Sequence, residues 1–148
     1  MKSSVGRLVS ILYRKNQVYL NVVLKPLHIT ASEVPILIHL FGRDGISQEE
    51  LSSFLVIDKA ATARVVQSLL DKGFLLKEKD PEDRRANRIF LTEQARQQRE
   101  TIFSYLQHWT DFLTAGIDEA SVRTMFTVLE AMADKVENAD FRELGAHV

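Results

Sequence analysis

The sequence predicts a mainly α-helical protein with one small β-hairpin, and three adjacent segments carry that prediction. Residues 47–55 have the pattern of a short capped helix. Residues 58–73 form a longer helical pattern with an apolar stripe at 3.6-residue spacing. Residues 74–91 contain two short strand patterns separated by turn-forming residues. Two helices joined by a tight turn and followed by a hairpin make a winged helix-turn-helix domain.

Helices are expected on both sides of this domain. Before it, residues 5–25 form an amphipathic pattern that ends at Lys25-Pro26. A capping box from Thr30 to Glu33 then predicts a helix through Phe41, in which Pro35 would remove one backbone hydrogen bond.

After the hairpin, Thr92 is expected to cap a long helix that runs to about Ala115, and Asp118 to cap a last helix through Val136. The terminal helices carry more apolar residues than a monomer of 148 residues needs, which favours a homodimer. The chain is therefore predicted to be a single domain over 1–148. Residues 30–92 would form its winged helix-turn-helix lobe, and residues 1–29 and 93–148 its helical dimerisation lobe.

The two central helices have clear local boundaries. Ser47 opens a capping box with Glu50 at the start of the shorter helix. Asp58 is the expected N-cap of the longer helix, and Gly73 is the expected left-handed residue after its end. The pattern thus predicts a tight turn between the helices and a sharp stop before the hairpin.

The face of residues 58–73 opposite the apolar stripe is small and polar, which suits insertion into a DNA groove. Arg64 and Gln67 are expected to hydrogen-bond base edges, with Lys59 and Ser68 on phosphates. The other predicted DNA contacts on this face are the methyl groups of Ala60, Ala61 and Ala63. At the start of the shorter helix, Ser47 and Gln48 are also expected to contact DNA. An exposed alanine is also a good helix former, so the methyl contacts have a structural alternative.

The hairpin carries a resemblance to a known family. Its turn and second strand read Asp-Pro-Glu-Asp-Arg-Arg-Ala-Asn-Arg-Ile-Phe-Leu-Thr over residues 80–92. This run contains an Asp-x-Arg-x-x-Arg signature at Asp83, Arg85 and Arg88. Together with Leu-Leu-Asp-Lys-Gly-Phe-Leu at 69–75, it resembles the MarR-type (multiple antibiotic resistance regulator) bacterial transcription factors over essentially the whole chain.

The resemblance implies roles for the basic residues of the wing. Arg85 would enter the minor groove, with the carboxylate of Asp83 holding its guanidinium. Arg84 belongs to the same basic turn, and Arg88 either pairs with Asp83 or lies beneath it as a structural residue. The alternative for all three arginines is a solvated charged turn.

The resemblance also implies a small-molecule crevice between the first, second and fifth helices. Tyr13, Arg14, His28 and His39 would supply polar contacts there to an aromatic or anionic effector. The alternative for the histidines is a structural or surface role, because they show no metal-ligand spacing.

Composition limits the remaining function classes. The net charge is −1, yet residues 1–92 hold 14 Lys and Arg against 10 Asp and Glu, while residues 93–148 hold 5 against 10. Positive charge is therefore concentrated where phosphates would lie. The chain has no cysteine, which excludes a cysteine zinc site and a thiol redox mechanism. No cofactor is predicted, no nucleophile–base pattern predicts an enzyme, and neither a membrane span nor a signal peptide is evident, so a cytoplasmic protein is expected.

These observations predict a homodimeric, ligand-responsive repressor that binds double-stranded DNA at a palindromic operator. The alternative is a winged-helix module that binds proteins instead of DNA. A protein-binding module has no reason to keep Asp83, Arg85 and Arg88 around a turn, and this favours DNA.

Overall fold

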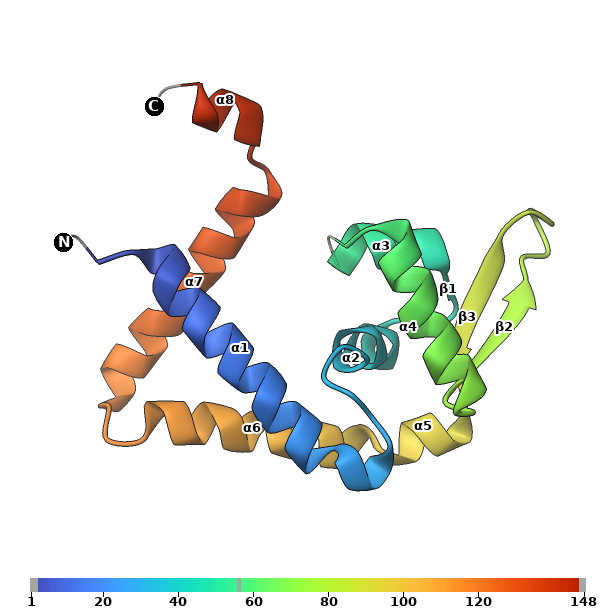
Figure 1. The fold of residues 1–148 in the computed structure, drawn as a ribbon, viewed down its shortest axis with the longest axis horizontal. Helices are drawn as coiled ribbons and strands as arrows, with labels where there is room; N and C mark the ends of the chain where they lie inside the picture. The colour runs from blue at the N-terminus through green and yellow to red at the C-terminus, as the bar shows by residue number, and fades with distance from the viewer. Residues whose placement is uncertain (1–2, 56, 147–148) are drawn as a thin grey trace. The chain divides into compact units, whose positions relative to one another are not determined.

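The computed structural model describes residues 3–55 and 57–146 and divides the chain into two compact units, residues 1–109 and 110–148. The boundary between them falls within helix α6. The first unit contains α1 (Val5–Val23), η1 (Lys25–Leu27), α2 (Val34–Gly42), β1 (Ile46–Ser47), α3 (Gln48–Leu55), α4 (Lys59–Asp71), β2 (Leu75–Lys79), β3 (Asn87–Leu91), α5 (Glu93–Gln97) and most of α6 (Arg99–Thr114) (Figure 1). The second unit contains α7 (Glu119–Glu137) and α8 (Phe141–Gly145).

The order of α3, α4, β2 and β3 confirms the predicted winged helix-turn-helix arrangement. Asp58 caps α4 by accepting a 2.7 Å hydrogen bond from the amide of Ala61. Gly73 follows the helix with φ +77°, and the amide of Phe74 donates to the carbonyl of Leu69 at 2.9 Å. This backbone geometry closes the C-terminus of α4 and starts β2 two residues later.

The hairpin belongs to a three-stranded antiparallel sheet with the strand order β1-β3-β2. In the hairpin Leu75 pairs with Leu91 and Lys79 with Asn87, which confirms both predicted strands. The sequence analysis missed β1, whose Ile46 pairs with Ile89. Two residues are too few to show an alternating pattern, but their pairing ties the start of α3 to the hairpin.

The start of α2 differs from the prediction. The helix begins at Val34, with Glu33 at its N-cap, so Pro35 lies in the first turn, where its missing N–H costs no helical hydrogen bond. Of the predicted capping box, the bond from the Thr30 amide to the Glu33 carboxylate is present at 2.9 Å. Residues 31–33 form a turn rather than helix.

Three other helix boundaries also differ. The helix α1 ends at Val23, two residues earlier than predicted, and a 3-10 turn with Pro26 follows. The predicted long helix is broken at Gln98, whose amide bonds the Ala95 carbonyl at 3.0 Å, three residues back. Helix α8 was not predicted, and Asp140 caps it by accepting from the amides at 142 and 143. By contrast, the N-caps Thr92 and Asp118 are confirmed.

The core of the first unit is aliphatic and draws on most of its elements. The helix α4 contributes Val66 and Leu69, both fully buried, so its position depends on this core. Burying one such side chain stabilises a fold by about 1.5–3 kcal/mol. The largest fully buried apolar side chains are Leu24, Ile36, Leu37, Leu40, Leu51, Leu69, Leu75, Ile89 and Ile102.

Two negative findings hold for the part of the chain that the structure describes. No helix there is both long and apolar enough to cross a membrane. Within the same residues, no three His, Asp or Glu side chains are grouped so as to hold a metal ion.

Candidate nucleic-acid interface

The outward face of α4 presents one basic side chain without an internal partner. Arg64 is exposed and, among the described residues, makes no hydrogen bond or ion pair. Lys59 lies 3.2 Å from Glu49 of α3, with both side chains more than 70% exposed (78% and 75%). Such an exposed pair contributes little free energy, so the ammonium group remains available to a phosphate. Gln67 donates from its amide nitrogen to Asp71 at 2.8 Å, which leaves the amide oxygen as an acceptor.

The alanines of α4 lie on the same face in two degrees of exposure. Ala60 is exposed, while Ala61 and Ala63 are half-buried. Methyl groups at these positions allow close approach of the helix to a groove.

Ser68 points inwards, contrary to the expectation that it meets a phosphate. Its hydroxyl donates to Oε1 of Glu33 at 2.7 Å, and the same carboxylate accepts from Nζ of Lys72 at 2.8 and 3.0 Å. A hydroxyl bonded to a buried carboxylate serves the interior, so Ser68 is not part of the interface proposed below.

The start of α3 and the wing enclose a depression of about 380 Å³. Ser47 caps α3 by accepting from the amide of Glu50 at 3.1 Å. Several residues singled out in the sequence come together in this depression, which is lined by Ser47, Gln48, Glu49, Lys77, Asp83, Arg85, Ala86 and Asn87.

The wing turn is held by carboxylates that bond the backbone. Asp83 accepts from the backbone amide of Arg85 at 3.0 Å, and the amide of Ala86 donates to the Asp83 carbonyl at 3.0 Å. The expected hold of Asp83 on the Arg85 guanidinium is therefore replaced by a hold on the Arg85 backbone. The side chains of Arg84 and Arg85 are exposed at this turn.

Arg88 pairs with Asp80, not with Asp83 as one expectation had it. Its Nε lies 3.1 Å from Oδ2 of Asp80. The other oxygen of this carboxylate, Oδ1, accepts a hydrogen bond from the amide of Glu82 at 2.9 Å. The Glu82 amide, followed by the Arg88 guanidinium, lowers the pKa of the Asp80 carboxyl. The sequence analysis placed Asp80 in the turn but missed its pairing with Arg88.

Asp44 fixes the base of the wing and was also missed. Its Oδ1 accepts from the amide of Leu91 at 2.9 Å, and its Oδ2 lies 2.8 Å from Nη2 of Arg96 in α5. One carboxylate thereby joins the loop before β1, the end of β3 and α5. No sequence pattern signals such a contact, because the partners lie 47 and 52 residues away.

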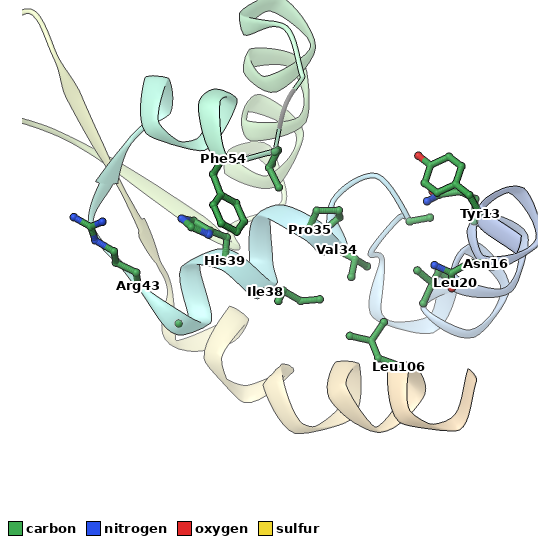
Figure 2. Close-up of a pocket in the computed structure, with 14 residues that line it drawn as sticks. Tyr13, Asn16, Leu20, Val34, Pro35, Ile38, His39, Arg43, Phe54 and Leu106 are labelled. Atoms are coloured by element: carbon green, nitrogen blue, oxygen red, sulfur yellow. The ribbon is translucent and has the colours of Figure 1, made fainter. Parts of the chain in front are cut away.

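A separate cavity of about 610 Å³ lies within the first unit, between α1, α2, α3 and α6 (Figure 2). Of the four residues expected to contact an effector, Tyr13 and His39 line this cavity, whereas Arg14 and His28 do not. His28 lines a smaller depression and has a left-handed backbone, with φ 58°.

Asn16 and Arg43 are among the polar residues of this cavity that the sequence analysis missed. Oδ1 of Asn16 is buried and has no hydrogen-bond partner in the described structure. Arg43 follows the last residue of α2. Earlier in the same helix, the ring of His39 lies against that of Phe54, with 3.8 Å between centroids and a tilt of 35° (Figure 2). The periodicity of α1 and α2 offered no signal for either residue.

A recognition helix with an unpaired outward arginine, beside a hairpin with a basic turn, defines a winged helix-turn-helix DNA-binding protein. Comparison with known proteins agrees. The MarR family model matches residues 29–86. A MarR transcriptional regulator from Methanosarcina mazei Go1 is 35% identical, with a TM-score of 0.85 over 88% of this chain and 94% of that one. The chain belongs to the MarR family, and it is a DNA-binding transcription regulator rather than an enzyme.

Two further relatives are more distant. The HTH-type transcriptional regulator YdgJ of Bacillus subtilis, itself described as uncharacterized, is 29% identical over 76% of this chain and 68% of its own length. A MarR family regulator from Listeria monocytogenes, solved in complex with a 26mer DNA, is 20% identical, with a TM-score of 0.85 over 93% of this chain and 91% of that one. At that identity the likeness shows the shared fold.

Proposed function

We propose that this regulator is a homodimeric repressor that binds a palindromic operator and is released by a small anionic aromatic molecule. The observation that carries the DNA-binding part is the exposed Arg64 on α4, which is unpaired among the described residues, together with the basic turn of the wing. The Listeria regulator bound to DNA supports the same use of the fold.

The DNA contacts divide by chemistry. Arg64 reads a base in the major groove, since a guanidinium offers two parallel donors to guanine O6 and N7. Lys59 meets phosphate, and Gln67 offers its free amide oxygen to a base edge. Arg85 enters the minor groove from the wing turn, where Asp83 fixes its backbone rather than its side chain.

The exposed apolar surfaces support a dimer. The helix α1 exposes a row of aliphatic side chains, and α7 and α8 in the second unit expose others that a second copy would cover. Two-fold symmetry would place two α4 helices in successive major grooves, about 34 Å apart. The residues concerned are Val5, Leu8, Leu12, Val18 and Val22 in α1, Phe126, Leu129, Met132 and Val136 in α7, and Phe141 and Leu144 in α8. We therefore keep the division into a DNA-binding lobe, residues 30–92, and a dimerisation lobe, residues 1–29 and 93–148, as part of the proposal.

The 610 Å³ cavity is the proposed effector site. Its walls are mainly aliphatic and aromatic, and its polar groups include Tyr13, Asn16, His39 and Arg43. An aromatic ring suits the apolar walls, and Arg43 is the cation that would pair with a carboxylate. The molecule must bind better to a DNA-incompetent arrangement of the dimer than to the competent one, because equal affinity would shift nothing.

The operator is tested by selecting duplexes from a random-sequence library and measuring their affinity by fluorescence anisotropy at several salt concentrations. Arg64→Ala should weaken the selected duplex about 5- to 150-fold, the equivalent of roughly 1–3 kcal/mol, and relax one position in each half-site. Arg142→Ala, which removes an exposed arginine of α8, is the charge-matched control. Equal weakening on every duplex would make Arg64 a phosphate contact.

Three further measurements test the rest of the proposal. A monodisperse monomer at micromolar concentration in light scattering would contradict the dimer. Failure to select any duplex, together with a lack of salt-dependent retention on DNA, would favour the protein-binding alternative. For the effector, salicylate-like acids should lower DNA affinity, and Arg43→Gln should weaken that response while leaving DNA binding without the acid unchanged.

A further inference from the structure

The most deeply buried ionisable side chain in the described structure belongs to Glu33, just before α2. Its exposed fraction is 2%, and both carboxylate oxygens are occupied. Oε1 accepts from Ser68 Oγ at 2.7 Å and from Lys72 Nζ at 2.8 Å. Oε2 accepts from Lys72 Nζ at 3.0 Å and from the Thr30 amide at 2.9 Å. The two side-chain donors are Ser68 of α4 and Lys72, the C-cap residue of the same helix.

The bonds from Thr30, Ser68 and Lys72 to the Glu33 carboxylate join the segment before α2 to the end of α4, and we call this contact the Glu33 junction. Because hydrogen bonds and ion pairs require a defined geometry, the buried carboxylate makes this junction directional. The apolar contacts of α4 through Val66 and Leu69 depend on area and tolerate small rotations of the helix. The bonds from Ser68 and Lys72 do not, because a shift of Lys72 leaves a buried charge unpaired and a shift of Ser68 removes a directional hydrogen bond from that charge. Buried ion pairs add little stability relative to well-packed apolar residues, so fixing one geometry is the better account of this one.

The anchored residues continue the row that faces DNA. Positions four apart on an α-helix advance by about 40° around its axis. The row Ala60, Arg64, Ser68 and Lys72 therefore turns gradually, from exposed positions at its start to the Glu33 carboxylate at its end. The orientation of Arg64 is thus tied to the two residues that Glu33 holds.

We propose that Glu33 is a positioning residue for DNA recognition, which fixes the rotation and axial position of α4 through Ser68 and Lys72. The proposal rests on α4 being the DNA-reading helix. A binding site must hold its contact groups to within about 0.5 Å and 10–20°. Loosening the junction should therefore reduce discrimination between sequences more than it reduces attraction to phosphates.

The test measures the ratio of affinities for a selected duplex and a scrambled duplex of equal length, at one salt concentration. Glu33→Gln leaves the Lys72 ammonium uncompensated, and Lys72→Met leaves the carboxylate unpaired. Each should lower the ratio at least tenfold. The double variant carries a neutral pair of similar shape, and it should recover a large part of the loss, which a double-mutant cycle quantifies.

Ser68→Ala removes one directional bond and leaves the ion pair in place. It should lower the ratio about threefold. If both charge variants fail to fold, this variant decides, because an unchanged ratio overturns the proposal. If the charge variants fold and their ratios stay within twofold of the parent, the proposal is likewise overturned.

A merely structural role is excluded by a matched control. Ile102→Val trims a fully buried side chain of α6, whereas the Glu33 carboxylate is bonded by Thr30, Ser68 and Lys72. If Ile102→Val lowers stability as much as the Glu33 and Lys72 variants do, it should still leave the ratio of affinities unchanged. A fall in the ratio as large as theirs would overturn the positioning role.

Amide hydrogen exchange separates this inference from the DNA-binding proposal. If the parent protein prefers no duplex, the operator proposal fails, while the junction is still measurable in the free protein. Glu33→Gln should speed exchange over residues 66–72 and leave β3 protected. Unchanged exchange over 66–72 would overturn the inference on its own.

Discussion

Replacing Gly45 by alanine should lower the free energy of unfolding by about 2–4 kcal/mol, because Gly45 lies where the helix-turn-helix meets the wing. Gly45 precedes β1, has φ +71°, and donates its amide to the carbonyl of Ile89 at 3.0 Å. A Cβ added there would lie 2.7 Å from Cε1 of Phe90, well inside ordinary contact distance. Both the backbone conformation and the ring therefore oppose a side chain.

The magnitude follows from two terms. A left-handed conformation costs a non-glycine residue roughly 1–2 kcal/mol, and forcing an extra carbon into a packed site typically costs about 1–3 kcal/mol. Against these, alanine lowers the entropy of the unfolded chain, which returns roughly 0.4–1 kcal/mol. Phe90 is half-buried, so part of the clash is relieved by a shift of its ring.

Two other glycines of the same unit separate these terms. Gly73 has φ +77°, but its added Cβ would meet only the Gln94 side chain, at 3.5 Å, so Gly73→Ala should cost about 1 kcal/mol. Gly42 ends α2 with no atom within 4 Å of an added Cβ, so Gly42→Ala should be neutral or slightly stabilising.

Urea unfolding followed by circular dichroism measures all three variants under the same conditions. The expected order of destabilisation is Gly45→Ala, then Gly73→Ala, then Gly42→Ala. A loss at Gly45 no greater than that at Gly73 would refute the clash with Phe90. A wild-type slope with a lower midpoint would show a loss of stability without a change in the surface exposed on unfolding.

Three further predictions concern the wing. Arg85→Ala should weaken DNA binding and reduce the salt slope by about one unit, measured by titration at several salt concentrations; an unchanged slope would place Arg85 away from phosphates. Asp83→Ala should also weaken binding, although it removes a negative charge, because the carboxylate holds the Arg85 backbone; tighter binding would contradict this reasoning. The lowered pKa of Asp80 means that its bonds to Glu82 and Arg88 stabilise the turn above about pH 4 and are lost as the pH falls through that pKa, a transition that the amide shift of Glu82 should report.

Several features of the fold were readable from the sequence because their causes are local. Asp58 caps α4 through an amide three residues away, and Gly73 supplies a backbone conformation that few other residues adopt. The hairpin strands were equally clear, since turn residues and alternation lie within 17 residues of one another. Even there, Arg88 turned out to bond Asp80 rather than Asp83, because the turn geometry decides which carboxylate faces the guanidinium.

The functional surfaces needed the packed structure. Tyr13 and His39 reach one cavity while Arg14 and His28 do not, and this difference depends on the rotation of α1 and on the turn after it. Arg43 joins the cavity because α2 packs beside α3. No periodicity reports such a meeting of elements.

The sequence by itself determined the class of fold, the recognition helix with its two ends, and the basic turn of the wing. These depend on hydrogen bonds and backbone preferences between near neighbours. Only the tertiary structure decided that Ser68 and Lys72 point at Glu33, that Asp44 clamps the wing, and that β1 completes the sheet. Those contacts join residues more than thirty positions apart, and a buried charge or an unpaired amide takes whichever partner the packing of the core brings within reach.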